Sequence, residues 1–226
     1  MNTKNSTIYT PQAAIFDLDG TILDSMWVWK KIDADFLASF GYPITQDYTD
    51  AMKAMTWEDG ARYTIDRYHL PKTPEEVIQI WMDMSHDCYR TKVTLKSGAK
   101  AYLDELHAQG VPMAIATSMC PMENIELVLS ANGIRDYFQN ITHSSEVTKN
   151  KSHPDIYLLA AERLGVKPQD TAVFEDILPA IQGARAGGFQ TVAIYDDISE
   201  NDWEQITSIA THAVRSWHEL FSEPKQ

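Results

Sequence analysis

The sequence contains little cysteine and no long apolar run. Its 2 cysteines, Cys88 and Cys120, fit neither a zinc-binding spacing nor a disulfide framework, so we interpret them as ordinary thiols in a reducing compartment. The first residues, MNTKNSTIYTPQ, are polar and lack the apolar segment of a signal peptide. No stretch is apolar enough to cross a bilayer. We therefore expect a cytoplasmic protein with no membrane partner.

Positive charge is also scarce. The chain has 19 Lys and Arg against 32 Asp and Glu, which gives a net charge of −13. A general nucleic-acid binder needs a basic face for phosphate contacts, so we expect no nucleic-acid partner. Anionic small molecules remain compatible with this charge, because a bound cation can reverse the field of a single cleft.

The pattern of apolar residues divides the chain into two kinds of segment. After about residue 95, strand-like runs such as PMAIATS, TAVFED and QTVAIYDD alternate with helical stretches that end at glycine. This alternation predicts an α/β fold with a Rossmann-like parallel sheet, whose first strand is AAIF at residues 13–16. Residues 25–94 instead have helical spacing throughout. We therefore predict a core domain from residues 1–24 and 95–226, with an inserted four-helix-type domain at residues 25–94.

Polar residues follow four of the predicted strands. In a parallel α/β sheet, ligands bind at the carboxyl ends of the strands, so these residues are expected at one edge. Each alone has an ordinary structural explanation as a turn residue, a helix cap or a solvated lysine. Together they bring acids, hydroxyls and a cation to one place; they are Asp17, Asp19, Thr117, Ser118, Lys149, Lys151, Glu175 and Asp176.

This combination of side chains suits phosphoryl transfer. A phosphate dianion requires a divalent cation, a fixed positive side chain and hydrogen-bond donors. Carboxylate oxygens favour Mg²⁺ over zinc. Asp17 can act as a nucleophile if a metal ion neutralises the repulsion between two anions, and Asp19 can donate a proton to the leaving oxygen.

Four motifs resemble those of the haloacid dehalogenase superfamily of phosphotransferases. DLDGT, at residues 17–21, resembles the first motif, and IATS resembles the second. NKSHPDIY resembles the third and places Lys151, rather than Lys149, in register as the motif lysine. VFEDILPAIQGARAGG resembles the fourth. The sequence departs from the common pattern at Asn150, Ser152, Ile177 and Ala180.

The resemblance covers essentially the whole chain and implies a role for each of these residues. Asp17 would form an aspartyl-phosphate, and Asp19 would act as general acid and then general base. The phosphoryl group would be bound by Thr117, Ser118 and Lys151. Mg²⁺ would be held by Asp17, the backbone carbonyl of Asp19 and Asp176, with Glu175 near or among its ligands.

The helical insertion between the first and second motifs resembles the helical-cap subclass, which includes beta-phosphoglucomutase. Mutases of that kind place a histidine and a basic residue in the cap, whereas this chain has Trp29 and Trp57 at the comparable positions. We therefore expect a phosphatase for a small phosphorylated metabolite, acting as a monomer. The alternatives are a sugar phosphomutase, a receiver-like phosphoacceptor module and a non-catalytic binding protein. We expect Asp24 to cap the first cap helix or to lie in the hinge.

Overall fold

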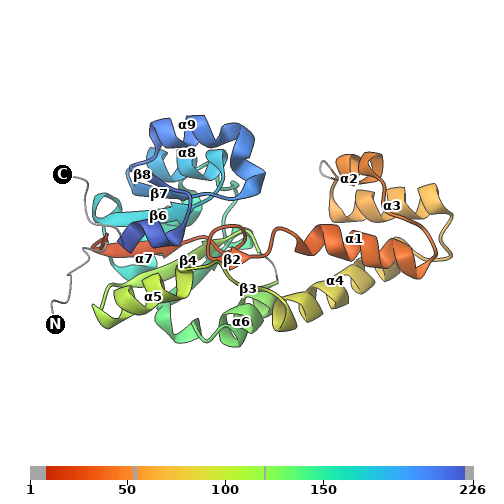
Figure 1. Cartoon of the computed structure of the whole chain (residues 1–226), viewed down its shortest axis with the longest axis horizontal. Helices are drawn as coiled ribbons and strands as arrows, with labels where there is room; N and C mark the ends of the chain where they lie inside the picture. Colours follow the sequence, from red (N-terminus) through yellow and green to blue (C-terminus); the bar gives the residue numbers. More distant parts are fainter. Residues whose placement is uncertain (1–8, 53–54, 120, 222–226) are drawn as a thin grey trace. The chain divides into compact units, whose positions relative to one another are not determined.

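The computed structural model describes residues 9–52, 55–119 and 121–221, so that Cys120 lies outside the described residues. The chain divides into two compact units (Figure 1). The first unit comprises the residues up to Asp24 and those from Thr94 onward, and the second comprises Ser25–Val93.

A six-stranded sheet forms the centre of the first unit. Its spatial order is β5-β4-β1-β6-β7-β8, and every neighbouring pair is parallel. The strands are β1 (Ala13–Phe16), β4 (Met113–Thr117), β5 (Asn140–His143), β6 (Thr171–Glu175), β7 (Gln190–Ile194) and β8 (His212–Val214). The predicted α/β fold with a parallel sheet is confirmed. Because β1 lies between β4 and β6, the ends of these three strands are neighbours.

Helices cover both faces of this sheet. They are α5 (Ala99–Ala108), α6 (Met122–Ala131), α7 (Asp155–Leu164), α8 (Leu178–Ala186) and α9 (Trp203–Ile209). In Figure 1, α8 and α9 lie on the opposite side of the strands from α5.

Alternate residues of the strands pack into different layers, as the pleat of a strand requires. Ile15 and Val173 belong to one buried cluster with residues of α7 and α8. Phe16 and Phe174, one position further along, stack on each other with ring centroids 4.5 Å apart. Phe174 also stacks on Trp217, at 5.7 Å and an interplanar angle of 11°. The central strands are therefore fixed by packing on both faces.

A two-stranded antiparallel ribbon lies at the points where the chain leaves the first unit and returns to it. It consists of β2 (Leu23–Asp24) and β3 (Thr94–Leu95), with Asp24 opposite Thr94. Of the two expectations for Asp24, the structure favours the second, because Asp24 lies in this ribbon where the chain leaves the first unit, and the first helix of the second unit begins at Val28.

The second unit is helical in its described part, as the spacing of apolar residues predicts. Its helices are α1 (Val28–Ser39), α2 (Gln46–Met52), α3 (Trp57–Tyr68) and α4 (Pro74–Thr91). The start of α4 has a clear local cause. Thr73 and Glu76 form a reciprocal capping box, and Pro74 occupies the first helical turn, where its missing N–H costs nothing.

Among the described residues, no helix combines the length and the hydropathy required to cross a membrane.

Candidate active site

The loop that follows β1 positions the first two acids. The Asp17 amide donates a hydrogen bond to the Phe174 carbonyl at 3.0 Å, which continues the β1–β6 pairing by one residue. The chain then turns at Gly20, whose φ of 81° is readily accessible only to glycine. Asp17 is buried and Asp19 is half-buried. The two acids therefore differ in burial although they are only two positions apart.

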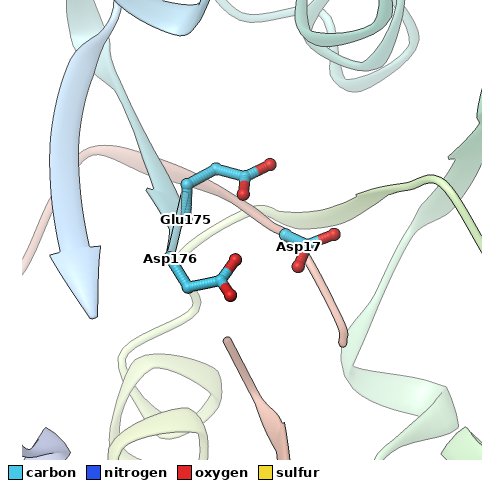
Figure 2. A group of neighbouring side chains, drawn as sticks. All are labelled: Asp17, Glu175 and Asp176. Atoms are coloured by element: carbon cyan, nitrogen blue, oxygen red, sulfur yellow. The ribbon is translucent and has the colours of Figure 1, made fainter. Parts of the chain in front are cut away.

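Two more acids lie at the end of the neighbouring strand β6. Figure 2 shows Glu175 and Asp176 at consecutive positions there, with Asp17 on the adjacent chain segment. Oxygen atoms from these three carboxylates all lie within 4.8 Å of one another, and all three residues are buried. The first and fourth motifs therefore meet, as predicted. Asp19 is not a member of this three-carboxylate group.

Lys151 places its ammonium among these acids. Its Nζ donates hydrogen bonds to Oδ1 of Asp17 and to Oε1 of Glu175, the latter at 2.6 Å. Lys151 is only 7% exposed. Lys149, in contrast, is exposed and lies 4.0 Å from Asp155. Of the two candidate lysines, the structure therefore places Lys151 in the acidic cluster.

The backbone of Lys151 is held by a close helix approach. A Cβ added to Gly183 in α8 would lie 2.1 Å from the Lys151 carbonyl oxygen, far inside van der Waals contact. Only glycine lets α8 approach this loop so closely. The glycine of the fourth motif therefore helps to position the lysine of the third.

The hydroxyl residues of the second motif lie at the end of β4. In the parallel register, Phe16 is opposite Ile115, and β4 continues to Thr117. The buried Thr117 hydroxyl accepts a hydrogen bond from the Met119 amide at 3.0 Å, whereas Ser118 is exposed. Neither residue caps α6, which has no side-chain cap. Thr117 therefore ends β4 and Ser118 follows it, and β4 lies next to β1, which Asp17 follows.

The electrostatics of the cluster explain how the acids tolerate one another. Burial raises the pKa of Asp176 well above its usual value, and the nearby Asp17 and Glu175 raise it further. Burial also raises the pKa of Glu175, although the Lys151 ammonium opposes this effect. Burial alone would lower the pKa of Lys151, but the charges of Asp17 and Glu175 outweigh it and raise this pKa. The acids therefore stabilise the charged form of Lys151, and one ammonium does not balance three carboxylates.

The donor set of this cluster fits a hard divalent cation. Three buried carboxylates supply oxygen atoms within 4.8 Å of one another, without nitrogen or sulfur donors in the group. Mg²⁺ prefers such oxygen ligands, whereas zinc sites usually include His or Cys. The excess negative charge around Lys151 points the same way. The residues present therefore fit a divalent cation.

The sequence pattern predicts no role for two further residues of the site. The Thr21 hydroxyl donates to Oδ1 of Asp176 at 3.3 Å, and the Thr21 carbonyl accepts a hydrogen bond from the Trp217 indole at 3.1 Å. The Tyr157 hydroxyl donates to Oε1 of Glu175 at 2.8 Å. The sequence does contain an indication for Tyr157, because this residue lies on the otherwise apolar buried face of α7. A buried tyrosine hydroxyl usually has a hydrogen-bond partner.

Comparisons with known proteins agree with this geometry. A family model described as haloacid dehalogenase-like hydrolase matches residues 14–194. A Drosophila melanogaster protein named "Probable pseudouridine-5'-phosphatase" is 30% identical over 190 residues, which cover 80% of each chain. A phosphorylated carbohydrates phosphatase from Thermotoga maritima is 23% identical over 181 residues, covering 80% of this chain and 83% of that one.

A solved structure supports the fold. The crystal structure of a Thermotoga maritima protein, provisionally described as a beta-phosphoglucomutase, has a TM-score of 0.81 and 22% identity. The match covers 92% of this chain and 96% of that one. Because the family model spans the chain from β1 to the end of β7, the chain belongs to the haloacid dehalogenase-like hydrolase family, and within it is similar to beta-phosphoglucomutases.

Proposed function

We propose that this protein is a Mg²⁺-dependent phosphatase that hydrolyses a small phosphomonoester through an aspartyl-phosphate intermediate. The observation that carries the proposal is the buried contact of the Lys151 ammonium with Asp17 and Glu175, beside Asp176. A nucleophilic carboxylate must be fixed in place, and the buried ammonium that donates a hydrogen bond to it does this. The phosphatase names of two relatives support the same reaction class.

In the first half of the proposed reaction, a carboxylate oxygen of Asp17 attacks the phosphorus atom. A new bond forms between this oxygen and phosphorus, while the bond from phosphorus to the ester oxygen breaks. Asp19 donates a proton to that departing oxygen, which leaves as an alcohol. Lys151 keeps Asp17 oriented and contributes positive charge near the transferring group. Thr117 and Ser118 supply hydroxyl donors to the phosphoryl oxygens.

In the second half, water attacks the phosphorus atom of the aspartyl-phosphate. Asp19, now a carboxylate, takes a proton from the attacking water. The bond between phosphorus and the Asp17 oxygen breaks, which releases inorganic phosphate and restores the carboxylate. Asp19 thus returns to its protonated state. The half-buried position of Asp19 outside the three-carboxylate group is compatible with this proton-transfer role.

Asp17, the Asp19 backbone carbonyl and Asp176 would hold Mg²⁺, with Glu175 beside them. The bound ion would supply positive charge that offsets the repulsion between the carboxylates and the phosphoryl oxygens. Glu175 already accepts two hydrogen bonds on Oε1, from Lys151 and Tyr157.

A phosphatase fits the chain better than a sugar phosphomutase. A phosphomutase must hold a second phosphate, which calls for cationic or several donor groups. Trp29 and Trp57, at the positions compared with mutases, are 39% and 44% exposed and pack edge to face at 4.9 Å. An indole offers one N–H donor and no charge. These side chains are therefore poor phosphate ligands.

Phosphate release from p-nitrophenyl phosphate and from a panel of phosphorylated metabolites tests the proposal. We expect release with Mg²⁺ and its loss when EDTA removes the metal. Interconversion of glucose phosphates faster than phosphate release would instead establish the mutase. Absence of phosphate release from every compound, with Mg²⁺ present, would contradict the proposed function.

A further inference from the structure

Tyr157 is a buried polar residue next to the proposed catalytic groups. Its side chain is fully buried on α7, and its ring packs against Phe189 with centroids 6.2 Å apart. Its hydroxyl donates to Oε1 of Glu175 at 2.8 Å. A tyrosine in an apolar layer requires such a partner, whereas phenylalanine fills nearly the same volume without one. The role of this residue therefore lies in its hydroxyl, because phenylalanine would fill the same space.

The acceptor of this hydrogen bond is the same oxygen that binds Lys151. Oε1 of Glu175 receives both the Tyr157 hydroxyl and the Lys151 ammonium, the latter at 2.6 Å. The same ammonium also donates to Asp17. Tyr157, Glu175, Lys151 and Asp17 thus form an unbroken chain of hydrogen bonds that ends at the proposed nucleophile.

Lysine and glutamate are poorly suited to fix each other. A lysine ammonium is a point charge on a flexible stem, and the terminal torsion of a glutamate has a broad range. The phenol is different, because its aromatic ring is held by packing within the sheet–helix layer that also contains Ile15 and Val173. Tyr157 is therefore the rigid end of this series of hydrogen bonds.

We propose that Tyr157 is a positioning residue for catalysis. Its hydroxyl fixes the Glu175 carboxylate, which holds the Lys151 ammonium against Asp17. This inference rests on the proposed phosphatase function for its catalytic consequence, but its geometric consequence is independent of any activity. Tyr157 contacts no reacting atom and acts only through Glu175 and Lys151.

The substitution Tyr157→Phe tests the inference, with Tyr102→Phe as the matched control. Both tyrosines are fully buried in the same unit, and the Tyr102 hydroxyl donates to the Tyr9 carbonyl at 2.7 Å. Phosphate release is measured at saturating Mg²⁺ and at temperatures well below the unfolding transition. In Tyr157→Phe we expect kcat and kcat/KM to fall together by about tenfold, because displaced catalytic groups lose transition-state stabilisation.

The control should leave kcat within about twofold of the wild-type value, even if its Tm falls as much as that of Tyr157→Phe. A kcat of Tyr157→Phe that also stays within about twofold would overturn the inference while leaving the phosphatase proposal intact. An equal loss of kcat in both variants would also overturn it, because the loss would then follow from burial of any tyrosine hydroxyl.

Crystal structures of the wild type and of Tyr157→Phe give a readout that needs no activity. We expect the Glu175 carboxylate to rotate and the Lys151 Nζ to move away from Asp17 in the variant. If the Lys151–Glu175 contact keeps its length to within about 0.3 Å and Asp17 keeps its contact, the inference is wrong. This result holds even if the wild-type protein releases no phosphate, so the two proposals fail separately.

Discussion

Asp17 lies in a cluster in which acidic side chains outnumber basic ones. Two other buried carboxylates have oxygens within 4.8 Å, and Lys151 provides the ammonium that contacts it. An amide at this position would keep the size of the side chain but lose its charge and most of its nucleophilicity. The chemical role of Asp17 can thus be separated from its structural role.

We predict that Asp17→Asn abolishes phosphate release, lowering kcat by a factor on the order of 10⁴ or more, because an amide does not form the acyl-phosphate. The fold should persist, since removing one of three crowded carboxylates relieves repulsion. Steady-state phosphate release and thermal unfolding measure the two effects. Near-normal turnover in this variant would show that Asp17 is not the nucleophile.

The matched control is Asp136→Asn, which makes the same chemical change at an exposed position in a short helical turn. This control should retain wild-type kcat.

Among the individual residues of the site, the sequence predicts the charged ones better than the uncharged ones. Asp17 and Asp176 follow strands and Glu175 ends one, and strand order alone brings these three acids to one edge. The hydrogen bond from Tyr157 depends instead on how α7 is rotated against the sheet. Helical spacing identifies the buried face of α7 but not which strand residue the hydroxyl meets. Its partner could therefore not be predicted.

Helix α8 can approach the loop that carries Lys151 because Gly183 has no Cβ. Exchange of a helical glycine for alanine normally stabilises a protein by about 0.5–1 kcal/mol. Here the added Cβ would lie 2.1 Å from the Lys151 carbonyl oxygen, so helix and loop must separate. The expected sign of the stability change is therefore reversed.

We predict that Gly183→Ala destabilises the protein by about 1–3 kcal/mol. It should also lower kcat by a factor on the order of 10², since Lys151 is displaced. Urea unfolding and phosphate release measure these effects. Gln182→Ala, at an exposed position of the same helix, is the control. A Gly183→Ala variant as stable as the wild type would contradict the close approach.

A second link between elements joins the turn after β5 to α7. Glu146 accepts hydrogen bonds from Arg163 on both carboxylate oxygens, at 3.1 and 2.6 Å, and from the His143 amide at 3.0 Å. The Arg163 hydrogen bonds lower the pKa of Glu146 to about 2, despite an opposing effect of burial. The folded state therefore binds a proton on the Glu146 carboxylate more weakly than the unfolded chain does.

Because the folded pKa is lowered, the contribution of this link to stability is fully present above the unfolded pKa of about 4.3. It is lost as the pH falls from there toward about 2. We predict that Glu146→Gln flattens the pH dependence of the unfolding free energy in this window. Urea titrations at several pH values test this, with Glu123→Gln at an exposed site as control. An unchanged slope in Glu146→Gln would refute it.

The longer elements agree with the sequence pattern, and the shortest ones do not. Runs such as TAVFED and QTVAIYDD contain β6 and β7, because buried parallel strands are continuously apolar. The ribbon of β2 and β3 has two residues in each strand, too few to show any periodicity. Its pairing is set by where the chain leaves and returns. For this reason the sequence pattern does not predict that Asp24 is paired with Thr94.

The insertion of the second unit interrupts the first at only one place. Asp24 and Thr94 are opposite each other in the antiparallel ribbon, so a two-residue turn can join them directly. The first unit also has its own buried core, including Ile15, Val173 and Phe174. The first unit therefore contains the elements that a separate domain requires.

We predict that replacing residues 25–93 with an Asn-Gly turn leaves a core that folds cooperatively. Circular dichroism and thermal unfolding test this expectation. A second variant, with one further residue in the turn, shifts the ribbon register and should be less stable, because a slip by one residue reverses the side-chain faces. A shortened chain without a cooperative transition would disprove the independence of the core.

The central position of β1 also has a consequence for biosynthesis. In the register of the sheet, Ala14 of β1 is opposite Met113 of β4, and Ala13 is opposite Thr171 of β6. About 100 residues of chain therefore separate β1 from its first partner, and a ribosome needs roughly 5–20 s to make them. During this time the apolar AAIF strand has no sheet to join. The apolar residues of β1 therefore lack their sheet partners until β4 and then β6 have been synthesised.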